Sequence, residues 1–322
     1  MRFLITGGAG FIGSHLAEEL LRANHKGIVL DDLSTGRYEN IEHLLKNKNF
    51  EFVEGTILNA TLVDKLVEQV DAIFHLAAAV GVDLIVKKPL ESLTTNIKGS
   101  EIVLDTALRY HKKILITSTS EIYGKNINGP LKENDDRILG SPLKTRWSYS
   151  TAKAVDEMLA YIYWKEKKLP SVIVRLFNIV GPRQTGAYGM VVPRFIEQAL
   201  RNEPITVYGT GKQSRCFLYV KDVVGALIKL IEEPKAVGEV FNIGSQEEVT
   251  IEALASQIIK ITKSRSRVEY IPYEKAYEEG FEDMQRRVPD ITKIHKMIGF
   301  KSNFSLSQII EDIVRHLKSS KI

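Results

Sequence analysis

The stretch LITGGAGFIGSHLAEELL, residues 4–21, joins a short apolar strand to a helix through a glycine-rich turn. Its glycines Gly7, Gly10 and Gly13 follow one another at intervals of three residues. In the most familiar dinucleotide-binding motif, G-x-G-x-x-G, the intervals are two and three residues. The first glycine permits a tight turn, the second lets the backbone approach a pyrophosphate, and the third allows close helix–sheet packing. The helix N-terminus adds N–H donors and a partial positive charge. The stretch predicts a dinucleotide site that includes Phe11 and Ile12; the alternative is a tight turn without a ligand.

The pattern of this first unit repeats along the first half of the chain. Apolar strands are predicted at 2–6, 27–30, 50–53, 72–76, 113–117 and 171–175, and helices at 12–23, 60–69, 94–110 and 149–167. Strands that alternate with helices predict an α/β fold with a Rossmann-type, doubly wound parallel sheet. From residue 176 the elements become shorter, which predicts a smaller α/β domain over 176–322 after a nucleotide-binding domain over 1–175. The segment 219–243 regains the first pattern and is expected to return to the sheet.

Composition narrows the class of protein. The 322 residues are 44% hydrophobic and 26% charged, typical of a soluble globular protein. The net charge of +4 is spread along the chain, so no nucleic-acid-binding stripe is predicted. A single cysteine, Cys216, excludes a disulfide framework and a cysteine-ligated metal, and no metal site is predicted. Without a signal segment or an apolar run of about 18 residues, we expect a cytoplasmic protein with no membrane partner.

Two acids follow the second predicted strand, about twenty residues after the glycine turn. Asp31 comes first off the strand and Asp32 follows it. A carboxylate at this place accepts hydrogen bonds from a ribose diol and repels a 2′-phosphate. Asp31 therefore predicts NAD as the cofactor, in preference to NADP, unless both acids are only solvated loop residues.

Tyr149 and Lys153 are spaced i and i+4 in the segment YSTAK, which places both on one face of a helix. A phenol acts as a base near neutral pH only if its pKa is lowered, and a neighbouring ammonium and a cationic nicotinamide ring would lower it. Alone, the pair is commonly surface decoration. After a glycine turn and a series of βα units it predicts a catalytic base and its partner.

The motifs TGGAGFIG, FHLAA, TNIKGS, STSEIYG, YSTAK, RLFNIVGPR and YGTGKQSRCFLYVKDVV together resemble the extended short-chain dehydrogenase/reductase superfamily, in its nucleotide-sugar branch. The resemblance covers nearly the whole chain in the family's order. It implies that Tyr149 is the base at a sugar hydroxyl and that Lys153 binds the nicotinamide ribose. It further implies that Ser120 or Thr119 holds the sugar oxygen. One departure is Thr56, where the family usually has an Asp, which puts the adenine contact there in doubt.

The resemblance also implies further binding residues. It places the cofactor against Gly7, Gly10, Phe11, Ile12, Gly13, Asp31, Ile57, Leu76, Ala77 and Lys153. It places a UDP-sugar against Asn96, Asn178, Arg194, Tyr208, Gln213, Arg215 and Arg287. Among these Arg215 resembles the residue that grips the diphosphate, for which a guanidinium fork is suited.

Glu121, in STSEIYG, is the residue that bears on the reaction. Enzymes of this branch first oxidise the sugar C4 hydroxyl; epimerases typically have a small hydroxyl residue where Glu121 stands, and dehydratases and decarboxylases have an acid. The segments LGSPLKTRWSYS and R-V-P-D resemble UDP-glucuronate decarboxylases and UDP-apiose/UDP-xylose synthases, with Phe281 as a departure from a tyrosine. Arg287 would bind the uronate carboxylate. The alternative for Glu121 is a structural pair with a Lys or Arg.

The sequence thus favours decarboxylation of UDP-glucuronate to UDP-xylose or its 4-keto form. Alternatives are a UDP-glucose or UDP-uronate 4-epimerase, a sugar-nucleotide 4,6-dehydratase and, outside the enzymes, an NAD-binding redox sensor. The helices at 94–110 and 149–167 resemble the pair that forms a four-helix bundle across a two-fold axis in the family, which predicts a homodimer. Their apolar residues include Val103, Leu104, Met158 and Leu159.

Overall fold

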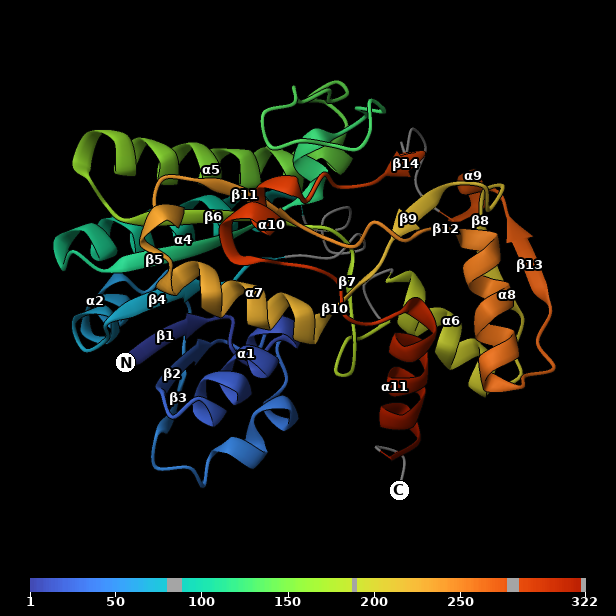
Figure 1. Cartoon of the computed structure of the whole chain (residues 1–322), viewed down its shortest axis with the longest axis horizontal. Coiled ribbons are helices and arrows are strands. Elements are labelled where there is room, and N and C mark those ends of the chain that lie inside the picture. Colours follow the sequence, from blue (N-terminus) through green and yellow to red (C-terminus); the bar gives the residue numbers. More distant parts are fainter. Residues whose placement is uncertain (80–88, 187–189, 277–283, 320–322) are drawn as a thin grey trace.

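A computed structural model describes residues 1–79, 89–186, 190–276 and 284–319, and its centre is a seven-stranded parallel sheet (Figure 1). The strand order is β11-β6-β5-β4-β1-β2-β3, so the sheet runs in both directions from β1 and β4. This order confirms the predicted Rossmann-type doubly wound fold. The strands are β1 Arg2–Thr6, β2 Lys26–Asp31, β3 Phe50–Glu54, β4 Ala72–His75, β5 Lys113–Thr119, β6 Ser171–Leu176 and β11 Val240–Ile243.

Helices cover both faces of this sheet (Figure 1). The alternation of strand side chains divides the core, because Phe3 and Ile5 of β1 belong to one buried cluster and Leu4 to the other. The first face is covered by α1 Phe11–Arg22 and α7 Val220–Glu232; the second by α2 Ala60–Glu68, α4 Pro89–Arg109 and α5 Ser148–Lys167. Within the described ranges, no helix combines the length and apolar character needed to cross a membrane.

Two boundaries differ from the sequence prediction in ways that matter for the site. Helix α4, described as Pro89–Arg109, already includes residues 89–93, which precede the predicted start at residue 94. Strand β5 extends to Thr119, and the chain then enters a 3₁₀ turn, η3, at Ser120–Tyr123. Glu121 therefore lies in a turn after the strand and not within it.

Most of the elements after β6 that lie outside the main sheet gather beside one end of it (Figure 1), whereas the short helix α10 Thr292–Ile298 contacts β11 and α7. Strand β11 and helix α7 belong to the main sheet and its cover, whereas the two-domain division at 175/176 stays a prediction. The other strands are β7 Ile179–Val180, β8 Ile205–Tyr208, β9 Ser214–Cys216, β10 Leu218–Tyr219, β12 Glu248–Thr250, β13 Val268–Ile271 and β14 Arg286–Arg287. The other helices are α6 Val191–Leu200, α8 Ile251–Thr262, α9 Tyr273–Ala276, α10 Thr292–Ile298 and α11 Leu306–Ser319; short 3₁₀ turns are η1 Tyr38–Asn40, η2 Glu42–Leu44, η4 Thr145–Trp147 and η5 Pro234–Ala236.

A buried polar network joins four of these segments. Arg175 of β6 donates to both carboxylate oxygens of Glu157 on α5 and, at 2.9 Å, to the hydroxyl of Tyr123 in η3. Tyr123 in turn donates to Asn242 Oδ1 of β11 at 2.7 Å. Because each member is hydrogen-bonded, the network can be buried without an unsatisfied charge. It fixes the end of the turn that carries Glu121.

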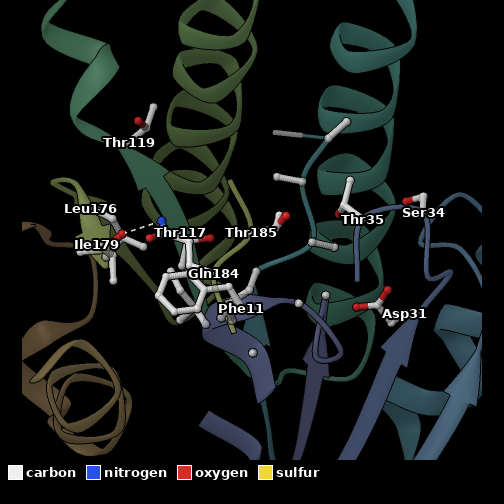
Figure 2. A pocket seen from close by; sticks show the side chains of 18 of the residues that line it. Phe11, Asp31, Ser34, Thr35, Thr117, Thr119, Leu176, Ile179, Gln184 and Thr185 are labelled. Atoms are coloured by element: carbon white, nitrogen blue, oxygen red, sulfur yellow. Dashed lines mark hydrogen bonds between the residues drawn. The ribbon is translucent and has the colours of Figure 1, made fainter. Parts of the chain in front are cut away.

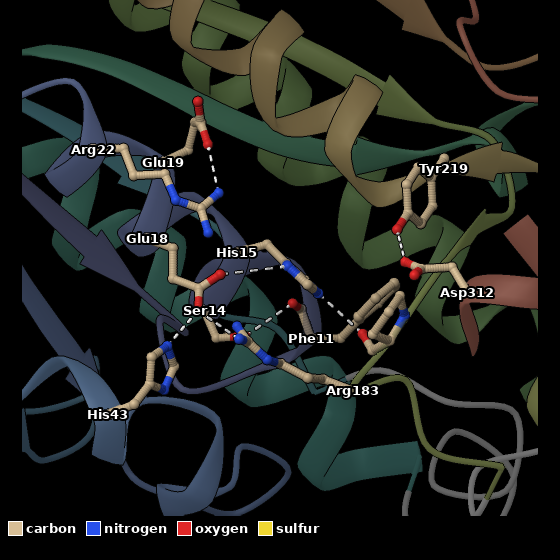
Figure 3. A network of polar contacts seen from close by, with 11 residues as sticks. Phe11, Ser14, His15, Glu18, Glu19, Arg22, His43, Arg183, Tyr219 and Asp312 are labelled. Carbon is tan, nitrogen blue, oxygen red and sulfur yellow. Dashed lines mark hydrogen bonds and ion pairs between the residues drawn. The ribbon is translucent and has the colours of Figure 1, made fainter. Parts of the chain in front are cut away.

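Two buried histidines make the fold sensitive to mild acid. Burial lowers the pKa of His15 to about 4 and that of His75 to about 3, so the folded protein keeps both rings neutral. His15 Nε2 lies 3.0 Å from the Pro182 carbonyl oxygen (Figure 3). Unfolded histidines bind protons below a pH of about 6.5, so the unfolded state takes up more protons there.

We therefore expect the free energy of unfolding to fall as the pH falls from about 6.5 toward 4. His15→Gln should reduce the loss by about 1–2 kcal/mol between pH 7 and pH 5, measured by urea unfolding. The matched control is His111→Asn, because His111 is exposed and its φ of 50° suits asparagine. An equal loss of stability in His15→Gln and in the parent protein would contradict the prediction.

Candidate active site

A pocket of about 390 Å³ lies where the strand order reverses, at the carboxyl ends of β1 and β4. Open α/β sheets bind their ligands at this place. In Figure 2, Asp31, Ser34 and Thr35 stand across the pocket from Gln184 and Ile179, so both halves of the chain form its wall. The sequence-predicted residues that line it are Gly7, Gly10, Phe11, Ile12, Gly13, Asp31, Ile57, Leu76, Ala77, Thr119, Ser120, Glu121, Tyr149, Asn178 and Arg287.

The glycine turn forms a backbone cradle, the glycine cradle, in which added side chains would clash with neighbouring backbone atoms. Gly7 has φ +71°, and a Cβ added to it would lie 2.7 Å from the Ala77 nitrogen. A Cβ on Gly13 would lie 2.3 Å from the Gly7 carbonyl oxygen. Gly10 is the N-cap of α1 and has no capping side chain, so the first N–H groups of the helix face the pocket wall. This arrangement fits a pyrophosphate, as the sequence predicts.

Asp31 connects the glycine turn to the end of β2. Its carboxylate accepts hydrogen bonds from the backbone N–H groups of Ala9 and Leu33, both at 2.9 Å. Burial raises its pKa, and these hydrogen bonds oppose that rise. Asp31 thus lies at the pocket wall with a fixed orientation. In this position its carboxylate oxygens suit hydrogen bonds from a ribose diol. Thr56, the departure noted in the sequence, accepts from the Leu58 N–H at 3.3 Å, and its neighbour Ile57 lines the pocket.

Glu121 forms a two-point ion pair with Arg146, the residue three positions before Tyr149. Arg146 donates from Nη1 to Oε2 at 2.6 Å and from Nη2 to Oε1 at 3.1 Å. Burial alone would raise the pKa of Glu121, but the charges of Arg146, Arg287 and Arg215 bring it below its ordinary value. The pair that the sequence left as an alternative is present, and its carboxylate member lies in the pocket wall. Glu121 is therefore a carboxylate at neutral pH.

Two further arginines, on neighbouring strands, act electrostatically on the Glu121 carboxylate. Arg287 of β14 and Arg215 of β9 are register partners in a parallel pair. Arg287 donates from Nη1 to Ser120 Oγ at 3.1 Å, and Arg215 donates to the carbonyl oxygen of Ser214 at 2.8 Å. Both side chains are buried. With one carboxylate among three guanidinium groups, this end of the pocket carries a positive charge suited to an anionic substrate group.

Tyr149 and Lys153 lie on the same helix but have different neighbours. Tyr149 lines the pocket, but burial, followed by the charges of Glu121 and Asp156, raises its pKa far above that of a free phenol. Lys153 Nζ donates to Asp156 Oδ2 at 2.8 Å, and Lys153 is not among the described lining residues. The pKa-lowering effect expected of Lys153 stays a prediction for the enzyme with its cofactor.

Of the other residues predicted to bind the substrate, some line the pocket and others are outside its described lining. Asn178 lines the pocket and donates to the Cys216 carbonyl oxygen at 3.1 Å. Asn96 is buried and holds both backbone polar groups of Ala79. Arg194 stacks 4.0 Å above the Tyr208 ring, and Gln213 donates to the Tyr208 carbonyl oxygen. Apart from Asn178 and Arg287, none of the predicted UDP-sugar residues is among the described lining residues, so their roles stay predictions. Phe281 lies outside the described residues.

Sequence reasoning missed two arginines of the pocket region. Arg146 is present in the quoted segment RWSYS, but nothing in the sequence connects it to Glu121, 25 residues away. Arg183, the last residue of RLFNIVGPR, lines the pocket and joins the two halves of the chain. It donates to Glu18 at 2.6 Å and to Ser14 at 3.2 Å on α1 (Figure 3).

Together the dinucleotide-type sheet, the glycine cradle and the tyrosine-containing pocket define an enzyme of the extended short-chain dehydrogenase/reductase class. The family model described as GDP-mannose 4,6 dehydratase matches residues 4–313. The chain belongs to this family.

Relatives and solved structures agree with this assignment. The chain is 43% identical over 315 residues to a UDP-N-acetyl-alpha-D-glucosaminuronate decarboxylase of Bacillus cytotoxicus, covering 98% of this chain and 97% of that protein. It is 36% identical to UDP-glucuronic acid decarboxylase 1 of Danio rerio, covering 98% and 72%. A crystal structure of UDP-glucuronic acid 4-epimerase from Bacillus cereus, in complex with UDP-glucuronic acid and NAD, superposes with a TM-score of 0.89 at 30% identity, covering 99% of this chain and 100% of that one.

Proposed function

We propose that the protein is an NAD-dependent decarboxylase of a UDP-linked uronic acid, acting through a 4-keto sugar. The observation that carries the proposal is the meeting of Arg287, Ser120 and Glu121 beside Tyr149 in one pocket. A uronate differs from a neutral sugar by its C6 carboxylate, and a buried guanidinium is the group best suited to bind it. The relatives at 43% and 36% identity are both decarboxylases of such sugars.

In the proposed mechanism, NAD when bound supplies the acceptor for the hydride of the sugar C4 carbon. The glycine cradle would hold its pyrophosphate, Asp31 its adenosine ribose and Lys153 its nicotinamide ribose. Tyr149 takes the proton of the C4 hydroxyl, and Ser120 or Thr119 holds the hydroxyl oxygen. Because the phenol is buried among negative charges, an approaching cation has to lower its pKa before it can act as the base.

Loss of CO2 then follows from the chemistry of a β-keto acid. The electrons of the breaking C5–C6 bond move into the 4-keto group as an enolate, and C5 must afterwards take up a proton. Arg287 orients the carboxylate that leaves. Glu121 is held ionised by its three arginines, so it is suited to hold a water that delivers the C5 proton and not to donate one itself. The product is either the 4-keto pentose or, after return of the hydride, UDP-xylose.

Release of CO2 is the direct test of this function. We expect CO2 and a UDP-pentose from UDP-glucuronate, detected by mass spectrometry in a panel that includes UDP-glucose and GDP-mannose. UDP-N-acetylglucosaminuronate is the second candidate substrate, because the relative at 43% identity is named for it. A UDP-uronate of unchanged mass but inverted C4 would identify a 4-epimerase, and loss of water from UDP-glucose or GDP-mannose a 4,6-dehydratase. No turnover at all would leave the redox-sensor alternative.

Cofactor preference gives a prediction at Asp31. We expect NAD+ to bind more tightly than NADP+, because the Asp31 carboxylate repels a 2′-phosphate. Asp31→Asn keeps an acceptor oxygen for the Ala9 N–H but removes the charge. It should lower the ratio of the Kd for NADP+ to the Kd for NAD+ by about tenfold, measured by calorimetry. Asp32→Asn is the matched control, since Asp32 also lines the pocket and its carboxylate accepts from the N–H and the hydroxyl of Ser34. Tighter binding of NADP+ by the parent protein would refute the assignment.

A homodimer through α4 and α5 also remains a proposal. Val103 and Leu104 lie in the chain's own core, so they do not support it. Met158 and Ile162, one helical turn apart on α5, are 62% and 39% exposed. We expect twice the chain mass of 36.3 kDa in light scattering, and a monomer when both residues are changed to Lys. Leu143→Lys, at a 90% exposed site outside these helices, is the control. A monomeric parent protein at micromolar concentration would end the proposal.

A further inference from the structure

Lys153 and Asp156 form a buried ion pair on α5. Lys153 Nζ lies 2.8 Å from Asp156 Oδ2, and the two side chains are 2% and 0% exposed. The spacing of three residues places both on one face of the helix. Within the described part of the chain, the second carboxylate oxygen, Oδ1, is buried and accepts no hydrogen bond. Removing one partner from such a pair leaves a buried charge, so this carboxylate strongly restrains the ammonium.

The contacts of the two side chains differ. Tyr149 lines the pocket, whereas Lys153 is outside the described lining and donates its hydrogen bond to Asp156. Asp156 is therefore the anion that fixes Lys153 in this arrangement.

We propose that Asp156 is a positioning residue that competes with the dinucleotide ribose for Lys153 and holds the ammonium away from Tyr149 until the dinucleotide binds. The inference rests on the proposed function, in which Lys153 holds that ribose. Breaking the buried pair costs free energy, which is subtracted from the free energy of dinucleotide binding. Asp156 thus links occupancy of the cofactor site to the state of the base: as the ammonium leaves Asp156, it can lower the pKa of Tyr149.

Binding of NAD+ without any sugar nucleotide tests the proposal. Asp156→Asn keeps the size of the side chain and removes its charge, so it should tighten the Kd for NAD+ by about tenfold in calorimetry. The matched control is Asp222→Asn on α7, also a buried helical acid, whose carboxylate accepts from Asn303. It should lower stability without changing the Kd. An unchanged or weaker Kd in Asp156→Asn would show that the pair is only structural.

Two further measurements make the result specific to Lys153. In a Lys153→Met background, Asp156→Asn should have no effect on the Kd, because the competing group is gone. A structure of the parent protein with NAD+ should place Lys153 Nζ more than about 4 Å from both Asp156 oxygens, beyond ion-pair range. If the pair remains intact beside bound NAD+, the proposal is wrong, whether or not the variants fold. Failure to release CO2 from a UDP-uronate would reject the proposed function but would leave these binding results unaffected.

Discussion

Glu121→Gln is expected to lower the steady-state rate of CO2 release from a UDP-uronate by roughly 10²-fold or more, because turnover slows at C5 protonation when the charge that holds the proton-delivering water is lost. Glutamine keeps the size of the side chain but has neither the charge nor the second acceptor oxygen that Arg146 requires. Tyr149 and Lys153 are unchanged, so NAD+ and the UDP-sugar should still bind. Oxidation at C4 should persist in a single turnover, followed by the absorbance of the reduced nicotinamide.

Glu248→Gln is the matched control for this experiment. Glu248 is also a glutamate held at two points by an arginine, Arg286, and it is not among the described residues that line the pocket. The control should keep a rate per folded molecule near that of the parent protein. If Glu121→Gln releases CO2 at the parent rate, the carboxylate is structural, and a 4-epimerase becomes the first candidate function.

Arg287→Ala is expected to raise the KM for a UDP-uronate by about 10²-fold, because a buried guanidinium–carboxylate contact is lost. Binding of neutral UDP-glucose, measured by competition, should change only a few-fold, since that sugar has no C6 carboxylate. Arg287→Lys should be intermediate, because it keeps the charge without the two-point geometry.

Arg286→Ala provides the comparison for this change. Arg286 adjoins Arg287 on β14, but its side chain is 41% exposed and pairs with Glu248. Arg286→Ala should leave the KM for the UDP-uronate and the binding of UDP-glucose nearly unchanged. Equal weakening of the uronate and of UDP-glucose by Arg287→Ala would mean that Arg287 binds the nucleotide part, and the decarboxylase proposal would lose its main support.

The main sheet and the cofactor end of the site could be predicted because their signals are local. Short apolar strands, helical periodicity and the glycines at 7, 10 and 13 each lie within one stretch of sequence, and a βα unit has few ways to pack. The position of Asp31 at the end of β2 follows from the same local pattern. These features needed no knowledge of contacts between distant segments.

The catalytic end could not be predicted in the same way. Arg146 is one of 44 lysines and arginines, and its pairing with Glu121 depends on how η4 and η3 meet. The spacing of Tyr149 and Lys153 correctly gives one helix face, but it does not reveal that a third residue, Asp156, holds the lysine. Such pairings depend on burial and on charges brought together by the fold, for which a single sequence has no periodic signal.

The network around Arg175 has a consequence for how the enzyme is made. Tyr123, which ends the turn carrying Glu121, is fixed by Asn242, a residue 119 positions later in the chain. A ribosome that has translated residues 1–176 has completed six strands of the sheet, but Asn242, the acceptor for the Tyr123 hydroxyl, has not yet been made. The turn that carries Glu121 therefore cannot reach its final hydrogen bonding until β11 has been translated and has paired with β6. Arg287 of β14 is translated later still. Nascent chains would acquire the shape of a nucleotide-binding fold well before they become enzymes, and a fragment ending near residue 175 should expose the buried arginine of β6 to water and to proteases.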